Sequence, residues 1–128
     1  MCVKEWKRIA ERETKRYREK KAFLRGVSDA GSAGTERSDA VRRWVLAVDY
    51  VLEYLHRVSP EKECFMRLYY GLDGERRRTD AKGMIALSFA LHVSTSALYE
   101  WRKEILTLLV IAAAQTRALH PYETEPLP

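Results

Sequence analysis

MIALSFALHVSTSALYEWRK, residues 84–103, has the pattern that decides which fold we expect for this chain. Leu87 and Leu91 are four residues apart and therefore share one face of a first helix. Leu98 and Trp101 share the inward face of a second helix in the same way. Two short helices joined by a tight turn form a helix-turn-helix, whose second helix can enter the major groove of DNA.

Small and polar residues define the turn between the two expected helices. Ser88 falls where the helices should cross most closely. His92 falls at the turn, where the backbone needs a positive φ that histidine tolerates better than most residues. Ser94 is placed to cap the second helix, because its hydroxyl can accept a hydrogen bond from an early backbone N–H.

The outward face of the second helix is polar, which is unusual for a helix buried in a core. We expect it to contact base edges and phosphates through Thr95, Ser96, Tyr99, Glu100 and Lys103. Hydroxyl groups can donate or accept at several bases, and a glutamate can accept from cytosine. Tyrosine and lysine more often meet phosphate. The alternative is a solvated face on a structural helix.

A further helix should precede this pair. Ser59 suits its N-cap and Pro60 its first turn, while Gly71 and Gly74 end it. The loop that follows carries three consecutive arginines and a residue suited to capping the next helix: Arg76, Arg77 and Arg78, then Thr79 or Asp80. We interpret the arginines either as a phosphate clamp beside the motif or as a solvated loop.

The first segment, residues 3–25, holds the basic character of the chain. It has ten basic and four acidic residues, a net charge of +6, whereas the whole chain has +5. Good helix formers dominate, so we expect one helix. Glu13 and Lys20 interrupt its apolar stripe, which predicts a partly packed helix that projects. It either contacts nucleic acid or forms a salt-bridged solvent face, with pairs such as Glu11 and Lys15.

The remaining segments complete an all-α fold of about five helices. Residues 26–39 read as a linker rich in glycine, serine and aspartate, and residues 40–57 as an amphipathic helix. The last helix should continue to about Leu119, before a loose tail at 120–128. Its apolar second half predicts a homodimer seam or burial against 40–57, through Ile105, Leu108, Leu109 and Ala112. We expect core anchors at Trp6, Trp44 and Trp101.

The run from Pro60 to Leu106 resembles the fourth region of bacterial sigma factors. The matching words are RLYYGLDG at 67–74 and LHVSTSALYEW at 91–101. In length and layout the chain also resembles small phage regulators of the ArpU and RinA kind. The resemblance implies a helix-turn-helix that reads promoter DNA, with RNA polymerase as a candidate protein partner. It implies a sigma-like DNA module rather than a sigma factor, because no core-polymerase-binding region is recognisable.

Composition excludes several classes of protein. The two cysteines and three histidines have no zinc spacing, and no nucleophile–base pair or phosphate loop is visible, so we expect neither an enzyme nor a cofactor. The N-terminus lacks the apolar core of a signal peptide, and the longest apolar stretch is too short to span a bilayer. We therefore expect a cytoplasmic protein with no membrane contact.

These observations predict a sequence-specific regulator of transcription that binds double-stranded DNA, and the resemblance implies that it regulates phage late genes. Residues 1–58 form its N-terminal helical part, residues 59–119 its helix-turn-helix domain and residues 120–128 its tail. One alternative is a DNA-packaging component similar to small terminase subunits. Another is a helical adaptor that binds only protein.

Overall fold

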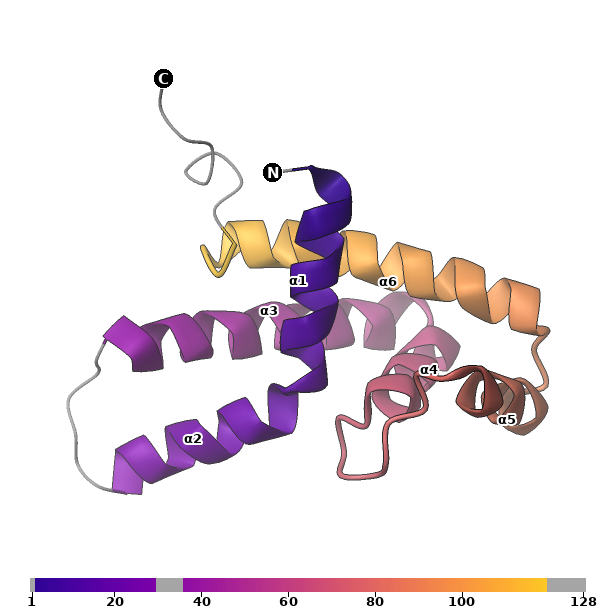
Figure 1. Ribbon diagram of the computed structural model, residues 1–128, viewed down its shortest axis with the longest axis horizontal. Helices are drawn as coiled ribbons and strands as arrows, with labels where there is room; N and C mark the ends of the chain where they lie inside the picture. The colour runs from indigo at the N-terminus through magenta and orange to yellow at the C-terminus, as the bar shows by residue number, and fades with distance from the viewer. Residues whose placement is uncertain (1, 30–35, 120–128) are drawn as a thin grey trace.

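The computed structural model describes residues 2–29 and 36–119, and these residues fold into α-helices without a β-strand (Figure 1). The expected all-α fold is therefore confirmed. The helices are α1 (Val3–Lys15), α2 (Tyr17–Asp29), α3 (Glu36–Val58), α4 (Pro60–Tyr70), α5 (Ala81–Leu91) and α6 (Thr95–Gln115). The expected loose tail at 120–128 and part of the expected linker, residues 30–35, lie outside the described residues.

The two longest helices, α3 and α6, pack along each other and form the centre of the molecule. α1 crosses the pair and packs mainly on α6, whereas α2 packs on α3 (Figure 1). The amphipathic helix expected at 40–57 is confirmed and begins earlier, at Glu36. Buried residues from both expected parts of the chain belong to one apolar cluster.

The expected single helix at 3–25 is wrong, because the chain bends at Arg16 (φ −99°, ψ 13°) and continues to Asp29 in a new direction. The bend lets the two halves bury different side chains. α1 buries Ala10 and Thr14, whose hydroxyl donates to the Ala10 carbonyl at 2.7 Å. α2 buries Tyr17, whose hydroxyl donates to Asp49 in α3.

The expectation that the basic helix projects is also wrong, because one carboxylate fixes α1 to two other helices. Glu11 forms a bidentate pair with Arg102 of α6, at 3.0 Å from Nε and 2.8 Å from Nη2. It also accepts a hydrogen bond from the Tyr70 hydroxyl of α4 at 2.8 Å. The hydrogen bond to Glu11 is the chief cause that raises the pKa of Arg102. The expected pair between Glu11 and Lys15 is replaced by these contacts.

The second half of α6 is core. Ile105 and Leu109 are fully buried within the chain, Ala112 is almost so, and Leu108 is partly buried. The expected homodimer seam is therefore wrong for Ile105, Leu109 and Ala112, because the chain's own helices already cover them, whereas Leu108 stays partly exposed. Burial against α3 is the interpretation that the structure confirms.

Tryptophans contribute to the same core, as expected: Trp44 is buried, and Trp6 and Trp101 pack against it partly buried. α6 ends at Gln115, before the expected Leu119, and the N–H of Leu119 bonds back to the Ala113 carbonyl at 3.0 Å. None of the described helices combines the length and apolar character needed to cross a membrane.

Candidate nucleic-acid interface

A three-residue turn joins α5 to α6, and its geometry is fixed by local hydrogen bonds. His92 adopts the left-handed conformation at φ 56°, as expected. The hydroxyl of Ser88 donates to the Val93 carbonyl at 2.6 Å and so ties α5 to the turn. The side chain of Ser94 accepts from the Ala97 N–H at 3.2 Å, which confirms the expected cap of α6. The start of α6 is therefore held at a defined angle to α5.

The start of α5 is fixed to the preceding loop. Asp80 rather than Thr79 caps the helix, and it accepts from the Gly83 N–H at 2.7 Å. A Cβ atom at Gly83 would lie 2.6 Å from the Arg78 carbonyl oxygen, so only glycine lets the loop backbone pass so close. The arginine-bearing loop is thus packed on the first turn of α5.

The outward face of α6 is exposed as expected, while Leu98 on its inward side is fully buried. Of the five site residues expected on α6, Thr95 is half-buried and the other four are exposed: Ser96, Tyr99, Glu100 and Lys103. Glu100 and Lys103 form an exposed ion pair at 3.2 Å, which is worth little in water and is easily exchanged for another partner. The polar side chains on this face are therefore accessible to a ligand.

The three arginines of the loop lie toward α1 and α5. Arg76 and Arg77 are exposed and Arg78 is half-buried. Arg77 donates to the Lys15 carbonyl at the end of α1 at 3.5 Å, and Arg78 approaches Glu75 at 3.8 Å. The structure therefore joins these arginines to the basic N-terminal helices, with α5 between them and the start of α6 (Figure 1).

Three adjoining hollows connect α2, the loop and α5 into one surface that we name the basic trough. The hollow along α2 shares Arg18 and Leu72 with the middle hollow. The middle hollow shares Arg76 and Arg77 with the hollow beside α5. Eight basic side chains line the trough: Lys15, Arg18, Lys21, Arg25, Arg76, Arg77, Arg78 and Lys82. Its four acidic side chains are Glu19, Asp73, Glu75 and Asp80.

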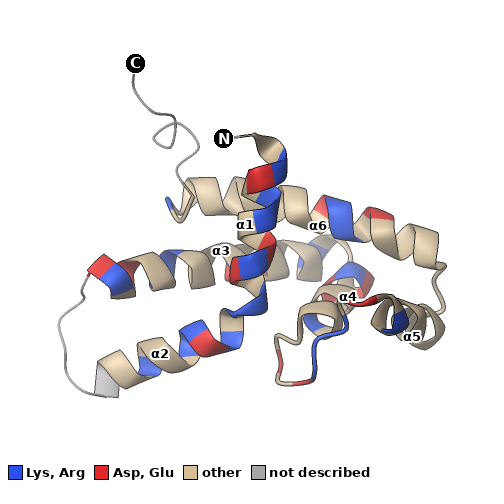
Figure 2. Cartoon of the chain, in the orientation of Figure 1, with Lys and Arg blue, Asp and Glu red and all other residues tan. Residues whose placement is uncertain are grey.

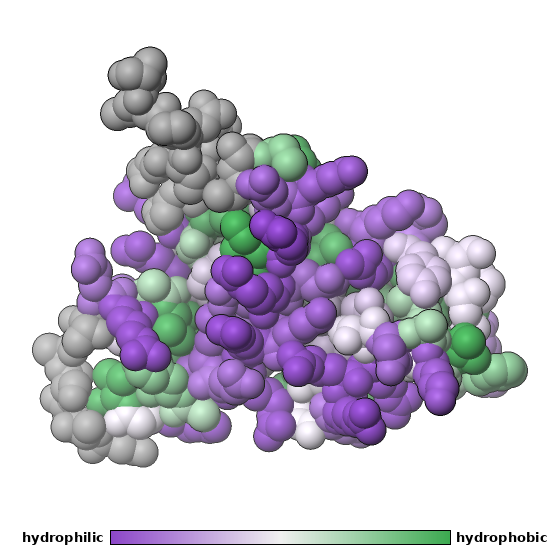
Figure 3. Space-filling view, viewed as in Figure 1, coloured by the Kyte–Doolittle hydropathy of each residue, from purple (hydrophilic) through white to green (hydrophobic). Residues whose placement is uncertain are grey.

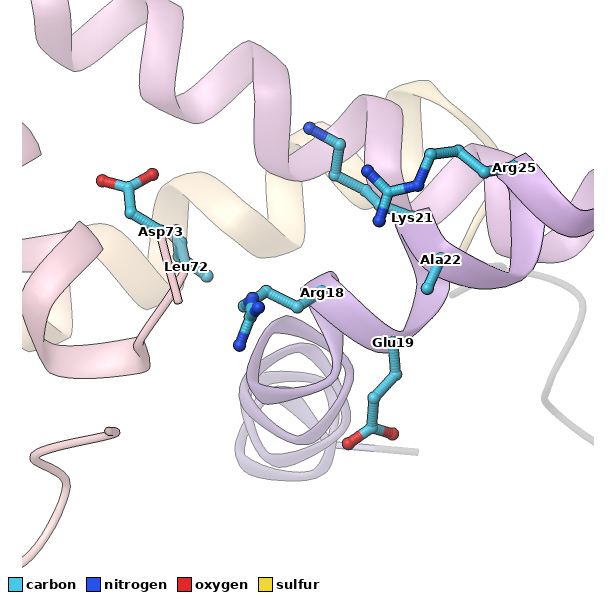
Figure 4. Close-up of a pocket in the computed structure, with 7 residues that line it drawn as sticks. All are labelled: Arg18, Glu19, Lys21, Ala22, Arg25, Leu72 and Asp73. Carbon is cyan, nitrogen blue, oxygen red and sulfur yellow. The ribbon is translucent and has the colours of Figure 1, made fainter. Parts of the chain in front are cut away.

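Figure 4 shows the hollow at the α2 end of the basic trough. The guanidinium of Arg18 extends toward the loop that carries Leu72 and Asp73, and Glu19 points away from Lys21 and Arg25. Figure 2 shows basic residues following α1, the start of α2 and the loop between α4 and α5. The same face of the molecule is strongly hydrophilic in Figure 3. Eight of the 23 basic residues of the chain therefore gather along this one surface.

Most cations of the basic trough are not neutralised by the protein. Among the described residues, seven of the eight make no ion pair, and Arg78 has only the 3.8 Å approach to Glu75. Basic residues elsewhere are paired at closer range, as in Lys20 with Glu13 at 2.6 Å and Arg67 with Asp73 at 2.8 Å. A surface with this excess of free positive charge attracts a polyanion.

The sequence singled out both the arginines of the loop and the basic segment 3–25, but not which cations of that segment meet the loop. Arg18, Lys21 and Arg25 recur at spacings of three and four, which places them on one helix face. That signal was available, but only the fold shows that this face meets the loop. A second missed feature is the exposed apolar pair Ile85 and Phe89 on the outer side of α5.

Within the described residues, no cluster of histidine, cysteine and acidic side chains could hold a metal ion. What this protein does must therefore be inferred from the α5–α6 pair and the basic trough. No known protein family, curated protein or solved structure matches the chain.

Proposed function

We propose that this protein binds double-stranded DNA sequence-specifically and regulates transcription. The outward face of α6 enters the major groove, and the basic trough contacts the phosphate backbone. The observation that carries this proposal is the α5–α6 pair: a locked turn presents a helix whose inner side is anchored by Leu98 and whose outer side is polar and exposed. That is the arrangement by which helix-turn-helix proteins read base edges.

The position of α6 suits insertion into a groove. Its N-terminal end reaches the edge of the molecule, where α5 lies beside it (Figure 1). Ser96 and Glu100 are four residues apart, so their exposed side chains stand on the same face. In the groove, the hydroxyl can donate or accept and the carboxylate can accept from cytosine.

The basic trough supplies contacts of a different kind. Guanidinium and ammonium groups bind phosphate irrespective of sequence, and their binding weakens as salt rises because bound counterions are released from DNA. The hollow nearest the motif is lined by Lys82 of α5 as well as by Arg76 and Arg77. A duplex held by α6 therefore has further cations beside the first helix of the pair.

The basic trough favours DNA binding over one of the two alternatives from the sequence, the helical adaptor, and the assembly state separates the other. Seven unpaired cations on one surface attract a polyanion, which a helical adaptor that binds only protein does not require. A packaging component would bind DNA but assemble as a ring, which a mass measurement detects. Transcription of phage late genes and contact with RNA polymerase rest on the resemblance of residues 60–106 to sigma factors.

Selection from random duplexes tests this proposal. Wild type should enrich one sequence, and Ser96→Ala combined with Glu100→Ala should relax that choice by about 1–3 kcal/mol for each base that α6 no longer reads. Glu5→Ala is the control, because it removes an exposed acidic side chain from α1 instead. If wild type and the double variant enrich the same sequence with the same affinity, α6 does not read DNA.

A further inference from the structure

The outer side of α3 carries an apolar stripe that no described residue covers. Leu46, Tyr50, Tyr54 and Val58 are 40%, 51%, 43% and 58% exposed and recur every four residues. Residues at this spacing form one ridge along a helix, the unit by which helices pack together. The opposite side of α3 is already buried in the core. α3 thus has one apolar side that is buried in the core and another that is exposed.

Two adjoining hollows between α3 and α6 extend this stripe into a groove. They share Tyr54 and Leu108, and neither is lined by a residue of α1 or α2. Ile111 of α6 is 51% exposed at one end, and the ion pair of Lys62 with Glu104 closes the other at 2.6 Å. We name the stripe and groove the α3–α6 apolar face, made of Leu46, Tyr50, Tyr54, Val58, Leu108 and Ile111.

This face holds most of the large apolar side chains exposed at the surface. Nine large hydrophobic residues are exposed in the described structure, and five of them belong to it. Scattered exposed apolar residues are ordinary, but a contiguous apolar patch marks an interaction site. The α3–α6 apolar face is therefore a candidate protein interface, separate from the outward face of α6 and from the basic trough.

We propose that the α3–α6 apolar face binds a second copy of this chain, with the two α3 helices antiparallel. The stripe reads aliphatic, tyrosine, tyrosine, aliphatic in both directions. A two-fold axis between Tyr50 and Tyr54 therefore sets Tyr50 against the partner's Tyr54 and Leu46 against the partner's Val58. An interface of this kind must be complementary to itself, and the order of side chains meets that condition.

Charge at the two ends of the stripe favours the same orientation. Arg43 is exposed near the start of α3, and Glu61 is exposed beyond its end, in the first turn of α4. Neither makes an ion pair within the described part of the chain. The antiparallel arrangement brings Arg43 near the partner's Glu61, whereas a parallel one would place arginine beside arginine. Complementary charge sets orientation more than affinity.

The dimer does not depend on DNA binding, so its test stands apart from that of the proposed function. It differs from the expected seam through Ile105, Leu108, Leu109 and Ala112, of which only the partly buried Leu108 belongs to the new face. No expected DNA-contacting residue lines the α3–α6 apolar face. If both proposals hold, two α6 helices are related by a two-fold axis, as in dimers that bind paired half-sites.

The first experiment measures mass by sedimentation over a concentration series. Wild type should approach twice the 14.9 kDa of one chain. Tyr50→Glu with Tyr54→Glu should remain helical and raise the dissociation constant of the dimer roughly tenfold or more. Phe89→Glu adds a charge at an exposed aromatic residue of α5 and should leave the dimer intact. A monomeric wild type, a larger ring, or a dimer indifferent to the tyrosine variants would overturn the proposal.

The second experiment tests the orientation by crosslinking. Cys2 and Cys64 are both exposed, so they are first replaced by serine. A chain carrying Leu46→Cys and another carrying Val58→Cys should then form a disulfide with each other when mixed and oxidised. Each alone should crosslink poorly, because the antiparallel arrangement keeps like positions apart. Efficient crosslinking of each variant to itself, without the mixed product, would contradict the antiparallel dimer.

Discussion

The α5–α6 pair and the α1–α2 pair each consist of two helices joined at a tight corner, but different forces hold them. In α5–α6 the corner is closed by neighbours: Ser88 bonds Val93, and Ser94 bonds Ala97. In α1–α2 the ion pair of Lys20 with Glu13 bridges the corner at 2.6 Å, and a distant pair, Glu11 with Arg102 of α6, fixes α1 to another helix. The α5–α6 corner is therefore held by serine hydroxyls within the corner itself, whereas α1 also depends on polar bonds and apolar packing to other helices.

Under the proposed function, this difference suits the two regions to different roles in binding DNA. A rigid corner suits a helix that must present Ser96 and Glu100 at a fixed angle to base edges. The α1–α2 region needs only to hold cations such as Lys15 and Arg18 near phosphates, which tolerate many geometries. Glu11 fixes α1 to α6 through Arg102, and this pair leaves Lys15 and Arg18 without an ion-pair partner among the described residues.

The largest expected effect comes from truncating Leu98, the buried residue that anchors α6 in the core. Leu98→Ala should lower the free energy of unfolding by about 2–5 kcal/mol, because Leu98 is fully buried and the truncation leaves a cavity. Urea denaturation measures this change. Ser96→Ala, two residues earlier on the exposed side, should change stability by less than about 0.5 kcal/mol. Equal effects of the two variants would show that α6 is not anchored by its inward face.

Breaking the long-range ion pair should have a smaller and more local effect. Glu11→Gln leaves Arg102 without its charged partner and should cost about 1–3 kcal/mol, toward the lower end because both side chains are partly exposed. Amide hydrogen exchange should quicken in α1 but not in the turn around His92. Glu5→Gln, on the exposed side of α1, is the matched control and should change neither. Uniform acceleration through both corners would contradict the separation of the two regions.

Alkaline pH should lower the free energy of unfolding through two tyrosines that help to hold the α1–α2 region. Burial, with the nearby Asp49, raises the pKa of Tyr17, and burial with Glu11 raises the pKa of Tyr70 well above 10.0. In the unfolded chain these tyrosines ionise near pH 10, while in the fold they stay neutral. Their stabilisation is thus complete below pH 10 and declines as pH rises, by up to about 1.4 kcal/mol per pH unit for each residue.

Unfolding free energies measured from pH 8 to pH 11 test this expectation. Tyr17→Phe should be less sensitive to alkali than wild type, although less stable at pH 8, because it cannot ionise in the unfolded chain. His92→Gln, which changes the α5–α6 corner and no tyrosine, should keep the wild-type pH dependence. A Tyr17→Phe curve parallel to that of wild type would exclude this tyrosine as a source of the effect.

The smallest expected effect concerns the cap of α6. Ser94→Ala removes the acceptor for the Ala97 N–H and should cost about 1 kcal/mol. Thermal unfolding detects the change, and Ser94→Asp should recover most of it, since aspartate also accepts this bond. If Ser94→Asp is no more stable than Ser94→Ala, the cap contributes little and the turn is held mainly by Ser88.

The features that the sequence predicted correctly are those set by neighbouring residues. The caps at Ser59 and Ser94 and the left-handed His92 depend on nearby backbone groups, so their positions can be read directly. The bend at Arg16 and the docking of α1 depend on Asp49 and Arg102, and nothing near Glu11 identifies its partner 91 residues away.

The same reasoning explains the outcome for the candidate site. The exposure of the polar residues on α6 followed from helix periodicity, because Leu98 and Trp101 define the inward side. The basic trough could not be assembled from the sequence, because Arg18 and Arg76 meet only through the packing of α2 and the loop. The expected dimer seam was wrong because an apolar helix face is equally consistent with a core and with an interface, and α3 had already covered it.

The central claim is that α6 reads sequence while the basic trough holds phosphate, and one measurement tests it most directly. Affinities for the enriched duplex and for a scrambled duplex are determined across a range of salt concentrations. Wild type is compared with Ser96→Ala/Glu100→Ala and with Arg18→Ala/Arg76→Ala. The trough variant should weaken binding to both duplexes alike and reduce the slope of log affinity against log salt by about 0.9 for each phosphate that it no longer binds. The α6 variant should keep the wild-type slope but show no preference between the duplexes. Wild type that binds neither duplex, or two variants that change slope and preference in the same way, would contradict the account.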